Sequence, residues 1–426
     1  MDEAPNKTFA GDIELIDCTI TSPNGTNLNV LHQVVGIELF EDIFAPFITG
    51  KLILKDALDI PNTFPLVGEE TLRLRFRTPA LPIEQEHAGN YLIFKMDDWV
   101  KSAERELIYV LHFTSLENLI DANKKISKTY SGKVSTIINK IVTDPDALES
   151  GKPFNYEEAS NTTKYISNFW SPIQNIMYLV PQAQTATQSP SFVFFENRNG
   201  FAFVSLEALY TGPTYQNFIW DNYSADISGG TSTTDIAQDY KRIFEYSVPQ
   251  NFNYIERLKS GAFGSQMITY DITTKKYAHV GYLPEFDKEA HLNPFFFQSK
   301  FLLKQSRAVL HRDNKYFNNF SGYGDVTNTS TYQRRMHLIS SAEASKIEIV
   351  VPGRSDYTVG QKVTVRLPIH ASIDASDSSS TAIDKMLSGN YVIAALCHKI
   401  SRDRHECVLQ LIKDSLILDL NNVKRV

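Results

Sequence analysis

The chain has 426 residues, of which 42% are hydrophobic and 21% charged, and its formal net charge is −7. Such a composition is that of a globular protein of about two to four domains, at about 100–200 residues per domain. The acidic balance excludes nucleic-acid binding by the surface as a whole. Three cysteines are too few for a disulfide framework and fit a reducing compartment.

No segment is typical of export or of membrane insertion. Residues 1–5 lack the basic and apolar regions of a signal peptide. No apolar run approaches the roughly 20 residues that a helix needs to cross a bilayer. We therefore expect a protein that is synthesised and folds in a cytosol and has no membrane partner.

Residues 8–120 predict a first β-rich domain. Its clearest strand alternates apolar and basic side chains in the order Leu72, Arg73, Leu74, Arg75, Phe76, Arg77. A period of two gives a strand one dry and one wet face. The arginine row is either a solvated face or a contact with another subunit or a tube protein. The second alternative rests on the strength with which Arg pairs with carboxylates. Residues 91–94 and 106–113 predict a hairpin.

Residues 121–210 predict a small α+β domain. Helical spacing relates its apolar side chains Val134, Ile137, Ile138 and Ile141. Further helices are expected over residues 163–167 and 172–180. A hairpin is expected around the turn at residues 197–200.

The remainder predicts a second β-rich domain, residues 211–258 and 345–420, interrupted by an inserted domain, residues 259–344. Within the insertion we expect a hairpin over residues 265–280 and a helix over residues 332–344. A short helix is expected over residues 253–258, and exposed loops over residues 224–238 and 373–388. Three consecutive aromatic residues must be buried against this chain or a neighbour: Phe295, Phe296 and Phe297.

An internal repeat relates the two β-rich domains. A Val-Gly turn precedes an alternating strand at residues 67–74 and again at residues 359–367. Residues 91–93 match residues 391–393, and residues 37–39 match residues 347–349. The alternative is a chance likeness between unrelated β-domains. We predict a mainly β fold with α+β insertions, in which two related small β-barrel domains are accompanied by smaller α/β domains.

Both ends and the middle of the chain resemble central baseplate hub proteins of contractile-tailed phages. The clearest strings are VVGIELFEDIF at residues 34–44 and GKLILKD at residues 50–56. The others lie at residues 253–255, 261–276, 388–393 and 409–415. The hub portion of type VI secretion spike proteins is similar to the same family.

The resemblance implies a structural protein of the virion tail baseplate, made in the host cytoplasm, without cofactor or enzymatic activity. It implies a homotrimer whose six barrels form a pseudo-sixfold ring between the hexameric tail tube and the trimeric central spike. Tape measure and baseplate wedge proteins are further candidate neighbours. DNA would only pass through the lumen, which we expect to be neutral or negative. The short stretch after Ser415 leads us to expect no fused spike domain.

Four potential metal ligands lie close in sequence: Cys397, His398, His405 and Cys407. If residues 401–403 form a three-residue hairpin loop, Cys397 lies opposite Cys407 on an apolar face. His398 then points to the other face, and His405 lies at a different position along the strand. Zinc needs converging ligands. We therefore predict core cysteines without a metal, with a cross-strand disulfide as the alternative.

Three adjacent acidic pairs are the candidates for hydrolytic chemistry: Glu69-Glu70, Asp97-Asp98 and Glu157-Glu158. Glycosidases need two facing carboxylates, whereas neighbours in a strand point to opposite faces. No Gly-Xaa-Ser-Xaa-Gly elbow or phosphate-binding Gly-Lys-Ser/Thr loop occurs. We predict no enzyme. The alternatives are a carbohydrate-binding or hydrolytic tail protein, acting on peptidoglycan or host glycan, and an adhesion or minor tail protein.

Overall fold

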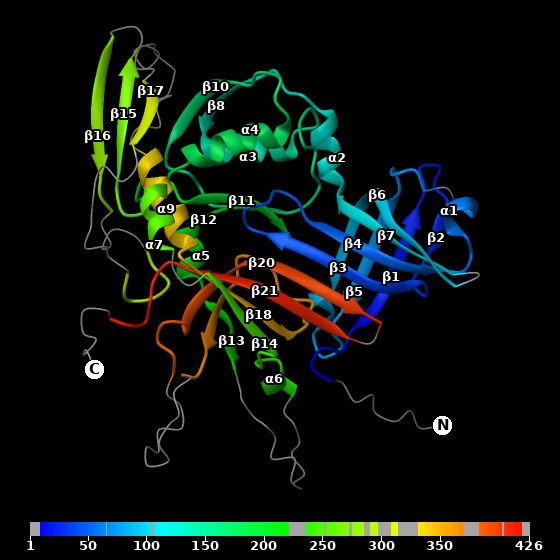
Figure 1. The fold of residues 1–426 in the computed structure, drawn as a ribbon. Helices are drawn as coiled ribbons and strands as arrows, with labels where there is room; N and C mark the ends of the chain where they lie inside the picture. The colour runs from blue at the N-terminus through cyan, green and yellow to red at the C-terminus, as the bar shows by residue number, and fades with distance from the viewer. Residues whose placement is uncertain are drawn as a thin grey trace, which may run out of the picture.

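The structure is a computed structural model, and it describes residues 9–64, 66–103, 106–220, 236–250, 253–271, 275–284, 290–296, 308–313, 331–369, 383–402 and 404–419. The fold is mainly β, as predicted, with one 13-stranded sheet and three small sheets. Helices are short and lie beside the sheets (Figure 1). No described helix is long and apolar enough to cross a membrane.

The first β-domain is one half of the large sheet, with the strand order β3-β4-β7-β6-β5-β1-β2. Its strands enclose a core that includes Leu52, Leu74, Tyr109 and Phe113. The bounds are β1 (Glu14–Thr21), β2 (Asn27–Asn29), β3 (Val34–Asp42), β4 (Thr49–Asp56), β5 (Thr71–Arg77), β6 (His87–Ala103) and β7 (Glu106–Ser115), with α1 (Ile60–Thr63) and a 3-10 turn (Ile83–Gln85) between strands.

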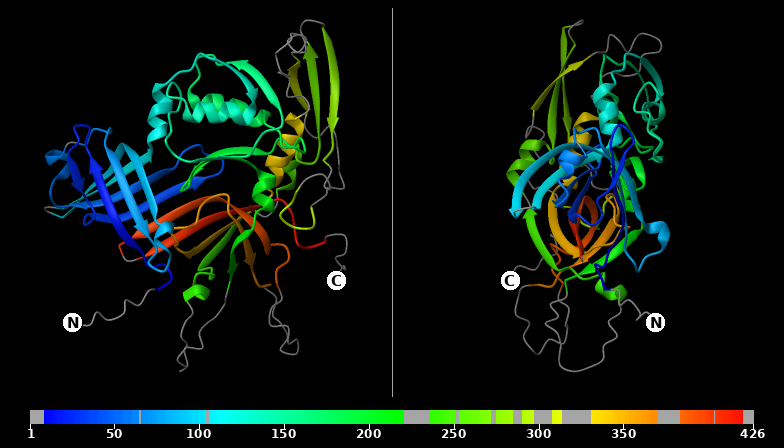
Figure 2. Two further views of the ribbon diagram at one scale, coloured as in Figure 1. Left: turned by 180° about the vertical axis from the view of Figure 1, so that it is seen from behind. Right: turned by 90° about the vertical axis from the view of Figure 1, so that its right-hand side faces the viewer.

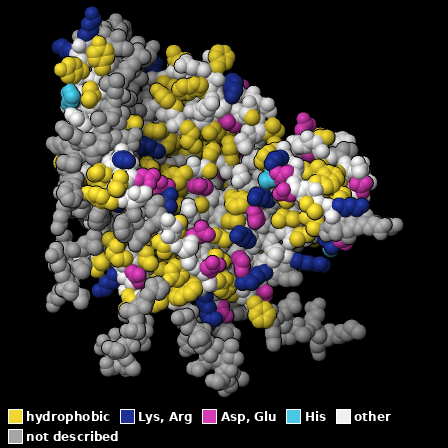
Figure 3. Space-filling model, in the orientation of Figure 1, with side chains coloured by type: hydrophobic (Ala, Val, Ile, Leu, Met, Phe, Trp, Pro, Cys, Tyr) yellow, Lys and Arg dark blue, Asp and Glu magenta, His cyan; other side chains and the backbone are white. Residues whose placement is uncertain are grey.

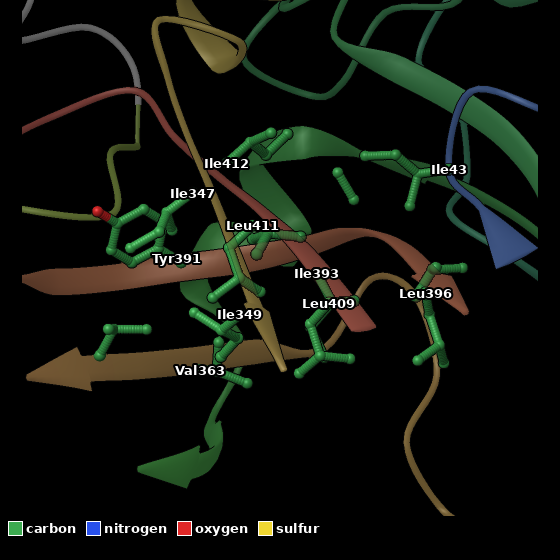
Figure 4. Close-up of a cluster of buried hydrophobic side chains, with 14 of the residues drawn as sticks. Ile43, Ile347, Ile349, Val363, Tyr391, Ile393, Leu396, Leu409, Leu411 and Ile412 are labelled. Carbon is green, nitrogen blue, oxygen red and sulfur yellow. The ribbon is translucent and has the colours of Figure 1, made fainter. Parts of the chain in front are cut away.

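The second β-domain is the other half, with the order β14-β18-β21-β20-β19-β13. Its core gathers Ile347, Tyr391, Leu409 and Leu411 from the neighbouring strands β18, β20 and β21 (Figure 4). The bounds are β13 (Thr214–Ile219), β14 (Glu245–Gln250), β18 (Ser345–Pro352), β19 (Lys362–Arg366), β20 (Gly389–Ser401) and β21 (His405–Lys413), with α6 (Ile236–Asp239) before β14.

The two β-domains repeat the same strand pairing. β4-β7-β6-β5 in the first corresponds to β18-β21-β20-β19 in the second, and every pair is antiparallel. A β-bulge follows Ile93 in β6 and Ile393 in β20. The backbone N–H of Ile93 donates to the Glu70 carbonyl at 2.8 Å, and that of Ile393 donates to the Gln361 carbonyl at 3.0 Å. These shared details confirm the predicted relationship between the domains.

The Val-Gly turns occupy equivalent places before β5 and β19. Gly68 has φ 95° and Gly360 has φ 86°, the left-handed region that favours glycine. One part of the predicted match is wrong, because residues 37–39 lie in β3, whose counterpart is β14. The counterpart of β18 is β4, since these two strands pair with the equivalent strands β7 and β21. Among the described strands that correspond, the direction differs at the edge, where β1 runs antiparallel to β5 and β13 parallel to β19.

The repeated strand pairing allows us to predict how a larger side chain at one core position would affect stability. Gly50 faces Phe113 across β4 and β7, and Ile347 faces Leu411 at the equivalent place. A Cβ on Gly50 would lie 2.2 Å from the Phe113 ring and 2.6 Å from the Glu38 carbonyl oxygen. We expect Gly50→Ala to lower the free energy of unfolding by about 2 kcal/mol. Phe113→Leu should recover part of this loss in the double variant, as urea unfolding would measure.

Gly36→Ala is the matched control, because its Cβ would lie no closer than 3.5 Å to neighbouring atoms. An equal loss at Gly36 and Gly50, or strict additivity with Phe113→Leu, would contradict this account of the packing.

A small α+β unit lies above the place where the β-domains meet (Figure 1). The predicted helix over residues 163–167 is wrong, because this segment forms β10 and pairs with β8. Its Thr, Tyr and Ile residues are of types that favour strands. The other predicted helices and the hairpin are confirmed. The bounds are α2 (Leu116–Asn123), β8 (Thr129–Lys133), α3 (Val134–Thr143), β9 (Phe154–Tyr156), β10 (Thr162–Ile166), α4 (Pro172–Leu179), a 3-10 turn (Val180–Gln182), β11 (Phe192–Asn197), β12 (Gly200–Ser205) and α5 (Leu206–Thr211).

The β11-β12 hairpin is buried on both faces. Phe192 and Phe194 pack into the core of the α+β unit. Val193 and Phe195 pack into the core of the second β-domain. This position between two cores explains the uninterrupted apolar run at residues 192–195.

The described part of the predicted insertion, residues 259–344, contains a three-stranded sheet and the helix α9, and α7, the short helix predicted just before it, leads into it. The hairpin β15-β16 and the helix α9 confirm the prediction. The expected loops at residues 224–235 and 373–382 lie outside the described residues. The bounds are α7 (Tyr254–Ser260), β15 (Ser265–Asp271), β16 (Lys276–Tyr282), β17 (Ala308–Asp313) and α9 (Tyr332–Ala342).

Candidate functional site at the junction of the two β-domains

The β-domains are joined edge to edge by backbone hydrogen bonds. β3 of the first pairs antiparallel with β20 of the second, from Gly36 opposite Ser401 to Asp42 opposite Ala395. Both halves are strongly curled, as the end-on view in Figure 2 shows. One continuous ladder therefore fixes how the two related domains lie relative to each other.

Glu41, near the end of β3, is a buried acid at this junction, with 1% of its surface exposed. One carboxylate oxygen accepts from the Arg198 N–H at 3.1 Å. The other accepts from the Thr358 hydroxyl at 2.7 Å and from the Val359 N–H at 3.1 Å. Burial raises the pKa of Glu41 to about 7, although these three hydrogen bonds lower it. Glu41 thus links the first β-domain to the turn between β11 and β12 and to the second β-domain.

A second buried acid, Glu196, forms a network with Lys152. Glu196 accepts from the Ile48 N–H at 3.1 Å, from the Ser115 hydroxyl and from the Lys152 ammonium at 2.6 Å. Lys152 also donates to Glu117 at 2.6 Å. Burial raises the pKa of Glu196, and Lys152 opposes that rise. The network holds the α+β unit on the first β-domain.

Neither acid was predicted from the sequence, although the position of each in its strand indicates a buried carboxylate. Ile37, Leu39 and Glu41 share one phase of the alternating strand β3, and all three are buried. Glu196 likewise continues the buried run of β11. A carboxylate in the apolar phase of a strand is a candidate for a buried, hydrogen-bonded charge.

The β20-β21 hairpin places His398, His405 and Cys407 together. Cys407 pairs with His398, and Cys397 pairs with Val408. The predicted pairing of Cys397 with Cys407 is therefore wrong by one residue, and such a shift exchanges the faces of a strand. The three cysteines of the chain, Cys18 included, are buried and free, so the alternative of a disulfide is wrong.

The predicted interface arginines all have partners within the chain. Arg73 pairs with Asp17 at 2.5 Å, Arg75 with Glu86 at 2.5 Å, and Arg77 with Glu14 at 2.6 Å. The alternation is as predicted, because the apolar residues between them are fully buried. The arginines thus form a partly solvated face, and a contact with another subunit stays a prediction.

The aromatic triplet is only partly described. Phe295 is 39% exposed and forms a backbone bridge with Leu416. The Phe296 ring lies 5.8 Å from the ring of His337 on α9. Phe297 lies outside the described residues. The expected burial is therefore not observed at Phe295, whose contact with a neighbour stays a prediction.

The acidic pairs serve local structure. Glu70 accepts from the Val67 and Gly68 N–H groups and so shapes the turn before β5. Asp97 pairs with His112 at 2.8 Å, and Glu157 accepts from the Ser205 N–H at 2.8 Å. These hydrogen bonds stabilise turns and strands within the chain.

Lys413 is a buried base that makes stability depend on pH. Its ammonium donates to the carbonyls of Met386 and Ser388, and burial lowers its pKa to about 7 from 10.5. Because the unfolded chain binds the proton more tightly, stability attributable to Lys413 should rise between pH 7 and 10.5. We expect Lys413→Met to remove a slope approaching about 1.4 kcal/mol per pH unit.

Lys399, exposed on the paired strand β20, gives the control. Urea unfolding at several pH values should show the slope unchanged in Lys399→Met. An unchanged slope in Lys413→Met as well would contradict the assignment.

The sequence matches no protein-family model and no curated protein. The structure does match solved structures. A tail protein from Neisseria meningitidis MC58 has a TM-score of 0.55 at 9% identity, covering 93% of this chain and 96% of that chain. The 43 kDa tail protein of prophage MuSo2 from Shewanella oneidensis has a TM-score of 0.54 at 9% identity, covering 94% and 99%. A type VI secretion component of E. coli, c3393, has a TM-score of 0.43 at 10% identity, covering 97% and 79%.

The chain therefore has the fold of phage tail proteins over nearly its whole length. This confirms, at the level of the fold, the resemblance seen in the sequence.

Proposed function

We propose that the chain is a structural subunit of a phage tail, and in particular the central hub of a contractile-tail baseplate. In this proposal it acts as a homotrimer. Three chains present six related β-domains, which would match the sixfold tail tube, and three identical opposite faces, which would match a trimeric spike. The proposal includes no enzymatic activity and no cofactor.

The observation that carries the proposal is the repeated β-domain. Both copies have the same strand order, the same bulge and the same turn, and a continuous ladder joins them. A strictly threefold object can meet a sixfold one when each subunit carries two similar surfaces. The buried junction around Glu41 supports this role, because it favours a fixed spacing between the two copies.

The partners in this proposal are the tail tube hexamer and the spike trimer, with tape measure and wedge proteins as further neighbours. The site of action is the baseplate of the virion. On the face shown in Figure 3, acidic and basic side chains are interspersed.

Negative-stain microscopy tests the proposal on purified chain, alone and mixed with the tube and spike proteins of the same tail. We expect threefold rings with six similar density lobes, at least in the mixture. The alternative of a glycan-active protein is tested by incubation with purified peptidoglycan. Particles that stay monomeric in the mixture, or measurable peptidoglycan binding or hydrolysis, would contradict the proposal.

A further inference from the structure

The buried group formed by His398, His405 and Cys407 has no role in the proposed function. All three side chains are fully inaccessible to solvent. His398 Nδ1 lies 3.0 Å from His405 Nε2, and Cys407 Sγ lies 3.2 Å from the former and 3.6 Å from the latter. Within the described part of the chain, no other three His, Cys, Asp or Glu side chains converge in this way.

These separations are close to those of ligands around one metal ion. Bond lengths of about 2.0–2.1 Å from zinc to nitrogen and about 2.3 Å to sulfur imply ligand separations of about 3.3–3.6 Å in a tetrahedron. Two of the three observed distances, 3.0 and 3.2 Å, are a few tenths of an ångström shorter than this range, and the third, 3.6 Å, lies at its upper end. Two imidazole nitrogens and one thiolate are also a donor set that zinc favours.

The surroundings keep the ring of His405 in this place. A Cβ on Gly353 would lie 2.1 Å from the His405 ring, so that only glycine leaves room for it. The His405 carbonyl accepts from the Gly353 N–H at 2.8 Å, and the His405 N–H donates to the Gly11 carbonyl at 2.8 Å. The ring of Phe76, from the first β-domain, lies edge-on to both histidines, at 5.7 Å from His398 and 5.8 Å from His405.

We propose that His398, His405 and Cys407 bind one structural zinc ion, which fixes the β20-β21 hairpin beside the junction of the two β-domains. The ion would replace the thiol proton of Cys407, and the two imidazoles would bind in their neutral form. The three side chains account for three of the four positions of a tetrahedral site. The inference is independent of the proposed function, because it concerns only the interior of one chain.

Metal content is the first test. The full chain, purified through a tag without histidine, should contain about one zinc ion per chain by elemental analysis. Cys407→Ser should lose most of the zinc. Cys397→Ser is the matched control and should keep the metal. Cys397 directly precedes His398 in β20, but it pairs with Val408.

Cobalt substitution tests the site even if Cys407→Ser does not fold. In the double variant Cys18→Ser with Cys397→Ser, Cys407 is the sole thiol of the chain. This variant, reconstituted with Co²⁺ alone, should show a thiolate-to-cobalt charge-transfer band and the d–d bands of tetrahedral cobalt. A wild-type protein with less than about a tenth of a zinc ion per chain, together with no such spectrum, would overturn the proposal.

Discussion

Glu41→Ala should destabilise the chain by about 3 kcal/mol, because it leaves the N–H groups of Arg198 and Val359 and the Thr358 hydroxyl unpaired in the interior. Urea unfolding of the full chain measures this loss. Glu38→Ala is the control on the same strand, since the Glu38 side chain is 31% exposed and lies 3.7 Å from Lys51. We expect the control to change stability by less than about 1 kcal/mol.

The effect of Glu41→Ala should depend on pH. The folded pKa of Glu41 is about 7, raised from 4.5, so its contribution to stability is full below pH 4.5 and is lost as the pH rises through 7. The difference between wild type and variant should therefore narrow from pH 5 to pH 8. Equal losses in Glu41→Ala and Glu38→Ala, or a difference that widens with pH, would contradict the role of Glu41.

Lys152→Met should lower the free energy of unfolding by about 3–5 kcal/mol, because it leaves two buried carboxylates without their cation. Lys152 lies 2.6 Å from both Glu117 and Glu196, which are 7% and 2% exposed. Adding Glu196→Gln should recover part of the loss, since one of the unpaired charges is then removed. The loss should also shrink at low pH, where Glu196 becomes protonated in the variant.

Lys133→Met is the matched control for this network. Lys133 pairs with Glu158 on the surface, where the side chains are 44% and 67% exposed. Exposed pairs contribute about 0–1 kcal/mol. A loss at Lys152 no larger than that at Lys133, or no recovery by Glu196→Gln, would show that the buried network does not hold the α+β unit in place.

The fold could be predicted from sequence to the extent that local patterns determine it. The alternation at residues 72–77 and the helical spacing at residues 134–141 reflect one buried face each, and both elements form as predicted. The segment at residues 163–167 shows the limit of this reasoning. Its strand exists because β8 lies beside it, and a short sequence window contains no information about that partner.

The junction was harder to predict, because it depends on contacts distant in sequence. Glu41 meets Thr358 across 317 positions, and no local pattern relates the two. The predicted pairing of Cys397 with Cys407 was wrong for a different reason. A loop one residue longer than assumed places His398 opposite Cys407, and this exchange of faces turns four scattered candidates into a group of three converging ligands.

The fixed ladder between β3 and β20 distinguishes this chain from two barrels on a flexible linker. Two flexibly linked copies would present their similar surfaces at variable distances. The proposed trimer would need equal spacing of the β-domains within and between chains, and the ladder with the buried Glu41 beside it fixes the spacing within one chain.

The count of subunits in an assembled tail tests the central proposal most directly. Electron cryomicroscopy of complete tails, reconstructed without imposed symmetry, would resolve how many copies surround the axis at the end of the tube. We predict three copies that present six related β-domains to the tube. Six copies, or a single copy, would contradict the proposal.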